Sequence, residues 1–162
     1  MIKLSPKFKD FLLCETKRDY LEGTTAAGKT TVGITKFMLM VAKSDKKYHL
    51  LCGLDLGTVE KNVINSECGL LAQFGVLANY YSNGKGRIGL PHIVYDTPTG
   101  EKIIYVSGYD NKNRWEKVLG AQYGCVYIDE VNIADMEFLR EITHRCQYMM
   151  TTSNPDAPDK PV

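Results

Sequence analysis

The sequence predicts an α/β fold in which helices pack against a mostly parallel β-sheet that also includes an added β-hairpin. The first observation is that short apolar runs, typical of buried strands, alternate along the chain with segments of helical periodicity. The second is a turn-forming segment at residues 96–101 that separates two further apolar runs. The 162 residues suit one domain, 1–162, in which residues 155–162 form an extended tail because three of these eight residues are proline.

The phosphate-binding pattern G-x-x-x-x-G-K-[ST] is matched in full by residues 23–30. Glycine at both ends lets backbone N–H groups turn inward around a phosphate. Lys29 can reach the β- and γ-phosphates, the Thr30 hydroxyl can bind Mg²⁺, and the helix that begins there directs its positive end toward the anion. The expected ATP-binding residues are Gly23, Thr24, Thr25, Ala26, Ala27, Gly28, Lys29, Thr30 and Thr31.

The segments on either side of this motif are those that a phosphate-binding loop requires. Apolar residues recur at helical spacing from Ile34 to Val41, so residues 29–42 are expected to form an amphipathic helix. Upstream, residues 19–22 are expected to form a short, half-polar strand. The alternative, a glycine-containing loop that binds nothing, is disfavoured by this context.

The other strands are recognised by short apolar runs that end in polar or turn-forming residues. They are expected at residues 48–54, 92–95, 102–106, 124–128 and 148–153. The second and third of these flank the turn and should pair as the hairpin. The segment 80–87 combines turn formers with two cations and two tyrosines, so it is either a solvated connector or a loop that touches DNA.

Two further helices are expected between the strands. The first follows Thr58 and continues to about Phe74. The second covers residues 134–146, with either Asn132 or Asp135 as its N-cap. Strands and helices therefore alternate as an α/β fold requires.

Two acids, Asp129 and Glu130, follow the clearest buried strand. At the carboxyl end of a strand next to the phosphate-loop strand, the first acid would face Mg²⁺ bound by Thr30, and the second would act as general base toward the attacking water. The alternative is a charge pair that only stabilises the next helix N-terminus. The polar residues 152–154 end the following strand, where they can hydrogen-bond the water or the γ-phosphate, or can simply form an Asn-Pro turn.

Composition limits the class of protein further. Apolar residues make up 44% of the chain and the formal net charge is +1, so a contact with nucleic acid would need a local patch. Five cysteines without a C-x-x-C pair argue against a zinc knuckle and a disulfide framework. No apolar run approaches the roughly 20 residues that span a bilayer and no export signal is evident, so a cytoplasm is the expected compartment.

Taken together, these motifs resemble the ATPase part of a phage terminase large subunit, the DNA-packaging motor of tailed viruses. The likeness runs over nearly the whole chain and rests on four segments: 22–31, 124–132, 140–145 and 151–156. It implies a P-loop NTPase of ASCE type, with helices on both faces of the sheet. It also implies that the strand of 151–153 lies between the phosphate-loop strand and the strand that precedes the acids.

The resemblance assigns roles to individual residues, with Lys29 and Glu130 as catalytic residues and Glu130 as the base. The metal site would consist of Thr30 and Asp129. The coupling motif, which converts hydrolysis into DNA movement, would be Thr152, Ser153 and Asn154.

One departure from the family pattern concerns the phosphate loop. Many members carry an arginine there, whereas this chain has Thr25 near that place, so the cation that stabilises transition-state charge should come from elsewhere. Arg145 is the first candidate for an arginine finger, although a helix C-terminal arginine can equally interact with the helix dipole. Arg114 and Arg87 are the other candidates.

The resemblance also implies ligands, partners and a place of action. The substrate would be ATP with Mg²⁺, and the partners would be double-stranded DNA, a portal protein and a small terminase subunit in the cytoplasm of a bacterial host. Copies would act as a ring, and the isolated domain could be a weakly active monomer. Family members continue into a lid and a nuclease domain, so this chain is expected to be a natural or engineered fragment. Phe8, Phe11 and Tyr20 could cover the adenine, or could only pack against the domain.

Three other functions compete with this interpretation. A helicase or AAA+ remodelling ATPase shares the same motifs. A P-loop kinase is disfavoured because kinases generally lack a strand-end glutamate such as Glu130. A scaffold that binds nucleotide without turnover is disfavoured by the intact Lys29 and Asp129.

Overall fold

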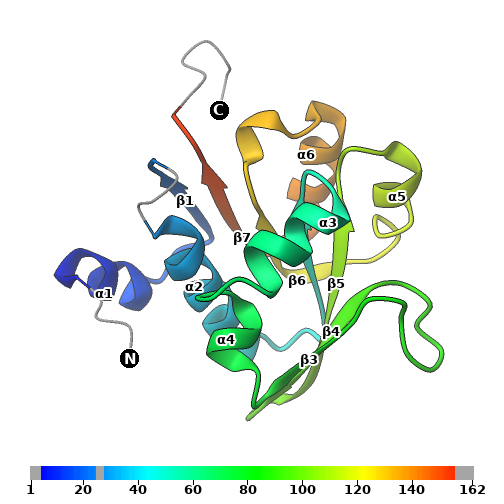
Figure 1. The fold of residues 1–162 in the computed structure, drawn as a ribbon, viewed down its shortest axis with the longest axis horizontal. Helices are drawn as coiled ribbons and strands as arrows, with labels where there is room; N and C mark the ends of the chain where they lie inside the picture. The colour runs from blue at the N-terminus through cyan, green and yellow to red at the C-terminus, as the bar shows by residue number, and fades with distance from the viewer. Residues whose placement is uncertain (1–4, 25–27, 156–162) are drawn as a thin grey trace.

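The structure, a computed structural model, describes residues 5–24 and 28–155. Within this part of the chain, seven strands form a single sheet in the order β1-β7-β6-β2-β5-β4-β3 (Figure 1). Their bounds are β1 Arg18–Glu22, β2 Tyr48–Gly53, β3 Ala78–Tyr81, β4 His92–Thr97, β5 Gly100–Gly108, β6 Tyr123–Ile128 and β7 Cys146–Ser153. The five strands from β1 to β5 in this order are parallel, and β4 and β3 are added antiparallel. The predicted α/β class is confirmed.

Helices cover both faces of the sheet (Figure 1). They are α1 Pro6–Leu13, α2 Lys29–Lys43, α3 Leu56–Val59, α4 Leu70–Phe74, α5 Lys112–Glu116 and α6 Met136–Thr143, with a π-helical segment η1 Glu60–Ile64 and a 3₁₀ turn η2 Val131–Ile133. Successive side chains of a strand point to opposite faces. Leu51 therefore packs in one core with α2, η1 and α4, while Leu50 and Cys52 pack in a second core with α5 and α6.

The position of β7 matches the arrangement that the family resemblance implies. Its residues pair with β1 on one side and with β6 on the other. β6, the strand that precedes the acids, is therefore separated from β1 by β7. The prediction that it lies directly beside the phosphate-loop strand is wrong. Because all three strands are parallel, their carboxyl ends still meet at one edge of the sheet.

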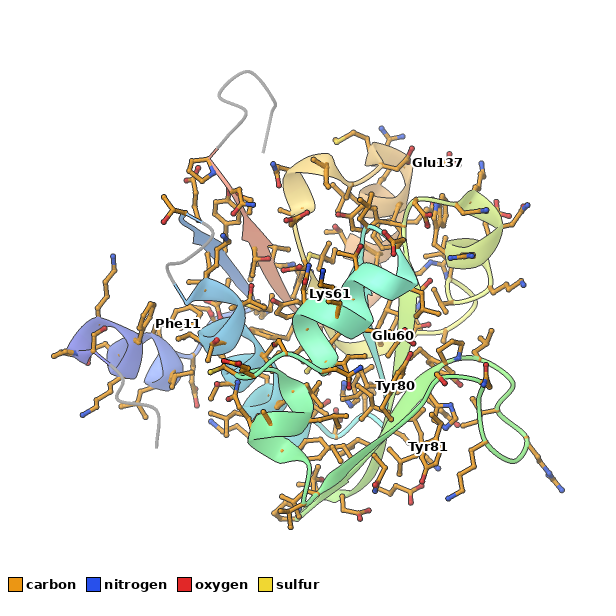
Figure 2. The ribbon with its side chains drawn as sticks, in the orientation of Figure 1. Phe11, Glu60, Lys61, Tyr80, Tyr81 and Glu137 are labelled. Carbon is orange, nitrogen blue, oxygen red and sulfur yellow. The ribbon has the colours of Figure 1, made fainter. Side chains whose placement is uncertain are left out.

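The predicted hairpin is confirmed, but it is larger than expected. β4 and β5 pair antiparallel, and β5 also pairs in parallel with β2, so the hairpin is continuous with the central sheet. Its outer strand β3 was missed, and it includes the first two residues of the expected connector 80–87. The Tyr80 hydroxyl donates to the Glu60 carboxylate at 2.6 Å and ties this edge strand to η1 (Figure 2).

The helix expected after Thr58 begins earlier and is interrupted. Asp55 is its N-cap and accepts from the Thr58 backbone N–H at 2.8 Å. The helical path ends at Ile64 and resumes at Leu70. Gly69, just before α4, comes so close to the end of η1 that a Cβ there would lie 2.7 Å from the Val63 carbonyl oxygen, so glycine permits the tight connection between the two helical segments.

The helix expected at residues 134–146 is shorter at both ends. Of the two N-cap candidates, Asp135 caps α6 by accepting from two backbone N–H groups. The helix ends at Thr143, because the Arg145 carbonyl already accepts from the Tyr123 N–H and the chain enters β7 at Cys146. No helix in the described ranges is both long and apolar enough to cross a membrane.

Candidate active site

The phosphate motif connects β1 to α2, as the predicted strand and helix require. The Gly23 N–H donates to the Ser153 carbonyl at 3.4 Å, which places the start of the loop beside the end of β7. Gly28 is the N-cap of α2 and has a φ of 72°, a conformation that glycine adopts without strain. The predicted ATP-binding residues Thr25, Ala26 and Ala27 lie outside the described residues.

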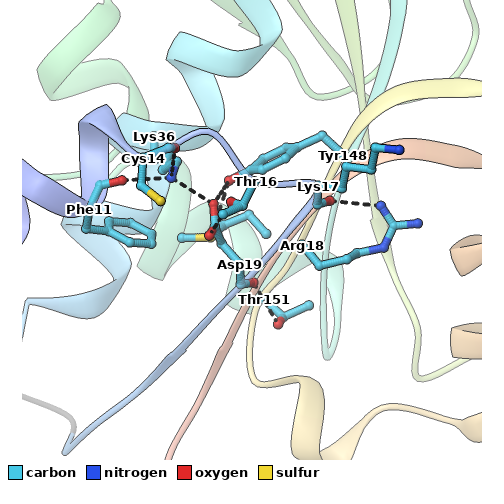
Figure 3. Close-up of polar contacts among 10 residues, drawn as sticks. Phe11, Cys14, Thr16, Lys17, Arg18, Asp19, Lys36, Tyr148 and Thr151 are labelled. Carbon is cyan, nitrogen blue, oxygen red and sulfur yellow. Dashed lines mark hydrogen bonds and ion pairs between the residues drawn. The ribbon is translucent and has the colours of Figure 1, made fainter.

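A buried ion pair locks α2 against β1 (Figure 3). The Lys36 ammonium lies 2.9 Å from an Asp19 carboxylate oxygen, and the two side chains are 1% and 8% exposed. The ammonium also donates to the Phe11 and Cys14 carbonyls, each at 2.7 Å. Asp19 further accepts from the Tyr148 hydroxyl at 2.8 Å. The strand and the helix on either side of the phosphate motif are thereby held together with the end of α1.

Lys29 is 7% exposed and points back over the start of its own loop. Its ammonium donates to the Gly23 carbonyl at 2.9 Å and to the Thr24 carbonyl at 3.3 Å. It also donates to the Asn154 amide oxygen. The Asn154 amide nitrogen in turn lies 3.4 Å from a Glu130 carboxylate oxygen. One side chain from the end of β7 therefore connects the phosphate-loop lysine with the expected base.

Asp129 is buried at the end of β6 and is held by two hydroxyl groups. Thr152 donates to its Oδ1 at 2.6 Å and Tyr127 at 3.4 Å. Burial raises the pKa of Asp129, although both hydroxyl groups and the charge of Lys29 act in the opposite direction. Hydroxyl groups from β6 and β7 therefore hold the carboxylate that is expected to bind the metal.

The two expected metal-site residues have the chemistry that Mg²⁺ requires. Thr30 and Asp129 offer only oxygen atoms, which Mg²⁺ prefers. In phosphate-loop enzymes the ion takes few protein ligands, because nucleotide oxygens and waters complete its shell. Within the ranges that the structure describes, no group of three or more His, Cys, Asp or Glu side chains is arranged to hold a metal ion.

Glu130 is half-buried and has an unusual backbone. Its φ of 51° and ψ of 52° place it in the left-handed region, where an L-residue costs about 1–2 kcal/mol. Its N–H donates to the Thr152 hydroxyl at 3.2 Å. Burial and the neighbouring charge of Asp129 raise the pKa of its carboxyl, while the charge of Lys29 lowers it. A raised carboxyl pKa suits a general base at neutral pH.

The three predicted coupling residues face different partners. Thr152 and Asn154 contact the two acids, as described above. Ser153 instead shares a hydrogen bond with the Tyr20 hydroxyl on β1. This contact ties the exposed Tyr20 side chain to the end of β7. The Phe11 ring packs against the core, and its centroid lies 4.3 Å from the Lys36 ammonium. Phe8 is partly exposed on α1.

The three arginine candidates lie in different parts of the molecule. The Arg145 side chain pairs with Glu141 at 3.4 Å. Arg145 directly precedes β7, so the eight residues of this strand, about 25 Å, separate it from the carboxyl edge of the sheet. It is therefore not part of the site in its own chain, and it lies beyond the helix that it was expected to end. Arg114 lines a cavity of about 240 Å³ at the carboxyl end of β5, which lies at the same edge of the sheet as the end of β6. Arg87 is exposed between β3 and β4.

Sequence reasoning missed Tyr127 and Tyr109. Tyr127 could have been found, because it precedes Asp129 by two residues in a strand and therefore shares its face. Tyr109 donates from its hydroxyl to the carbonyl oxygens of Asp129 and Glu130, both at 3.0 Å. No local pattern connects it with residues about 20 positions away.

The strand order, with β7 between β1 and β6, and the loop that joins β1 to α2 define a P-loop fold of ASCE type. Solved structures of large terminase from a thermophilic bacteriophage share it. Crystal form 2 of that terminase has a TM-score of 0.74 at 17% identity, covering 94% of this chain and 39% of that chain. The complexes with ATP-γ-S and with ADP have TM-scores of 0.64 and 0.65 at 18% and 20% identity.

This likeness is one of fold. The chain spans 34–39% of the length of those terminase chains. No protein-family model matches the sequence, and comparison with curated proteins finds no match. The resemblance that the sequence motifs indicate is thus matched by a similarity of fold.

Proposed function

We propose that this chain hydrolyses ATP and that hydrolysis drives the translocation of double-stranded viral DNA into a procapsid. The observation that supports it best is the hydrogen-bonded series from Lys29 through Asn154 to Glu130. It joins the phosphate loop, the coupling strand and a carboxylate with a raised pKa at one edge of the sheet. A site of this composition has the groups that phosphoryl transfer to water requires.

In the proposed reaction, Lys29 leaves the loop carbonyls and Asn154 to bind the β- and γ-phosphates of ATP. Thr30 and Asp129 would hold Mg²⁺, which neutralises charge on the phosphate oxygens when it is bound. Glu130 accepts a proton from the attacking water. Asn154, released from Lys29, is then free to hydrogen-bond the γ-phosphate or the water, so its partner changes when ATP binds.

The motor part of the proposal is supported by the fold shared with large terminase and by the position of Arg145. An arginine at the amino edge of the sheet cannot serve its own site, but in a ring it could complete the site of a neighbouring copy. Portal protein and a small terminase subunit would be the packaging partners, in the cytoplasm of a bacterial host. The isolated chain would then be a monomer with weak activity.

The test is ATP hydrolysis with Mg²⁺, with and without double-stranded DNA, for the wild type and two variants. Glu130→Ala should lower kcat by about 10²- to 10⁴-fold and leave nucleotide binding in place. Lys29→Ala should weaken binding of a fluorescent ATP analogue. Glu137→Ala is the matched control, because Glu137 is an exposed glutamate that pairs with Lys112 on the surface (Figure 2).

Two results would contradict parts of the proposal. Turnover that survives Glu130→Ala removes the assignment of the base. Phosphorylation of a small acceptor in place of water contradicts the proposed motor function, and the chain would then be a kinase.

A further inference from the structure

Tyr109 connects three strand ends at the proposed active site. It follows β5, and its backbone N–H donates to the Gly53 carbonyl at the end of β2 at 2.9 Å. Its hydroxyl donates to the carbonyls of Asp129 and Glu130, directly after β6. The side chain is 3% exposed, so water does not compete for these contacts. A single residue therefore links the ends of β5 and β2 to the backbone of both acids.

The backbone that receives these hydrogen bonds needs support. Among the described residues Glu130 is the only non-glycine residue with a positive φ. Strained backbone of this kind persists only where its surroundings hold it in place. The Thr152 hydroxyl holds the Glu130 N–H from the β7 side, and the Tyr109 hydroxyl holds the Glu130 carbonyl from the β5 side. Thr152 on β7 and Tyr109 directly after β5 therefore hold the Glu130 backbone from two sides.

The ring and the hydroxyl of Tyr109 have separable tasks. The ring packs 5.8 Å from the Phe138 ring in the core under α6, and phenylalanine would fill the same space. Only the hydroxyl reaches the two carbonyls. Burial and the charges of Glu130 and Asp129 raise its pKa, so it stays a neutral donor when the acids are ionised.

We propose that Tyr109 is a positioning residue that holds the Glu130 backbone in its left-handed conformation and so directs the carboxylate toward the attacking water. This inference rests on the proposed ATPase function. Without the hydroxyl, the Glu130 carbonyl still accepts from the Ile133 N–H at 3.1 Å, but the contact that ties it and the Asp129 carbonyl to the end of β5 is lost. The Glu130 peptide can then rotate toward ordinary backbone conformations, and its carboxylate moves with it. Misplacement of a catalytic group by about 1 Å can cost on the order of a hundredfold in rate.

The test compares Tyr109→Phe with Tyr123→Phe in the intact chain. Tyr123 is a matched control, since it lies 2% exposed in the same core and its hydroxyl donates to the Val118 carbonyl, away from the acids. Tyr109→Phe should lower kcat by about 10- to 100-fold, with KM and the affinity for a fluorescent ATP analogue within about twofold of wild type. Tyr123→Phe should leave all three unchanged.

A second measurement does not depend on turnover. Hydrogen exchange at the Glu130 amide, which donates to the Thr152 hydroxyl, should be about tenfold faster in Tyr109→Phe than in wild type or Tyr123→Phe. Unchanged exchange, or faster exchange with an unchanged kcat, overturns the positioning role even if Glu130→Ala is inactive. If the wild type has no ATPase activity under any condition, the proposed function fails, and the exchange comparison alone decides whether Tyr109 holds Glu130.

Discussion

Replacing Lys36 by methionine removes an ammonium whose partners all lie inside the protein. The variant keeps an unbranched apolar side chain, but the Asp19 carboxylate loses its cation at 2.9 Å and the carbonyls of Phe11 and Cys14 lose a donor. Removing one partner of a buried ion pair costs about 3–5 kcal/mol, because the other charge is left uncompensated. We expect Lys36→Met to lower the free energy of unfolding by about 4 kcal/mol.

Lys112→Met is a control that separates burial from ion-pair geometry. The Lys112 ammonium lies 3.0 Å from Glu137, almost the same length as the buried pair, but its side chain is 56% exposed against 1% for Lys36. Solvent screens the exposed pair, so this variant should unfold like the wild type. Similar losses in both variants would contradict the argument from burial.

The assay is urea unfolding followed by circular dichroism, with the free energy taken by linear extrapolation. Nucleotide affinity should fall together with stability in Lys36→Met, because Lys36 holds the helix that begins with Lys29. A loss of less than about 1 kcal/mol for Lys36→Met would refute the reasoning, since that is the range of a surface pair.

Two predictions concern pH. His49 accepts the Cys125 N–H on Nδ1, and burial lowers its pKa from 6.5 to about 4. Its contribution to the free energy of unfolding is therefore complete above pH 6.5 and is lost as the pH falls toward 4. The loss amounts to about 3 kcal/mol, and unfolding curves at several pH values should show it in the wild type but not in His49→Asn. Burial raises the pKa of Asp129, so its ionisation destabilises the fold as the pH rises through the raised pKa. Asp129→Asn should therefore raise the melting temperature at pH 7, with little difference at pH 3, and a lower melting temperature at pH 7 would contradict this.

The elements that the sequence predicted well have strong local patterns. The helix that begins at Lys29 and the strand before Asp129 each combine an apolar pattern with a clear boundary residue. The break between Ile64 and Leu70 was missed because apolar residues continue on both sides of it, and the close approach of Gly69 to the preceding turn exists only in the folded backbone. The strand β3 was missed because it is a short edge strand, and its pairing with β4 only exists once the hairpin has formed.

For the site, the sequence by itself determined which groups are present: a glycine-flanked loop with Lys29, a strand that ends in Asp129 and Glu130, and a third strand that ends in Asn154. These are local motifs, and the chemistry of each follows from its residue types. Only the tertiary structure decided which of them meet. Parallel strands bring their carboxyl ends to one edge, so strand order and register bring Lys29, Asn154 and Glu130 together, add Tyr109, and leave Arg145 at the opposite edge.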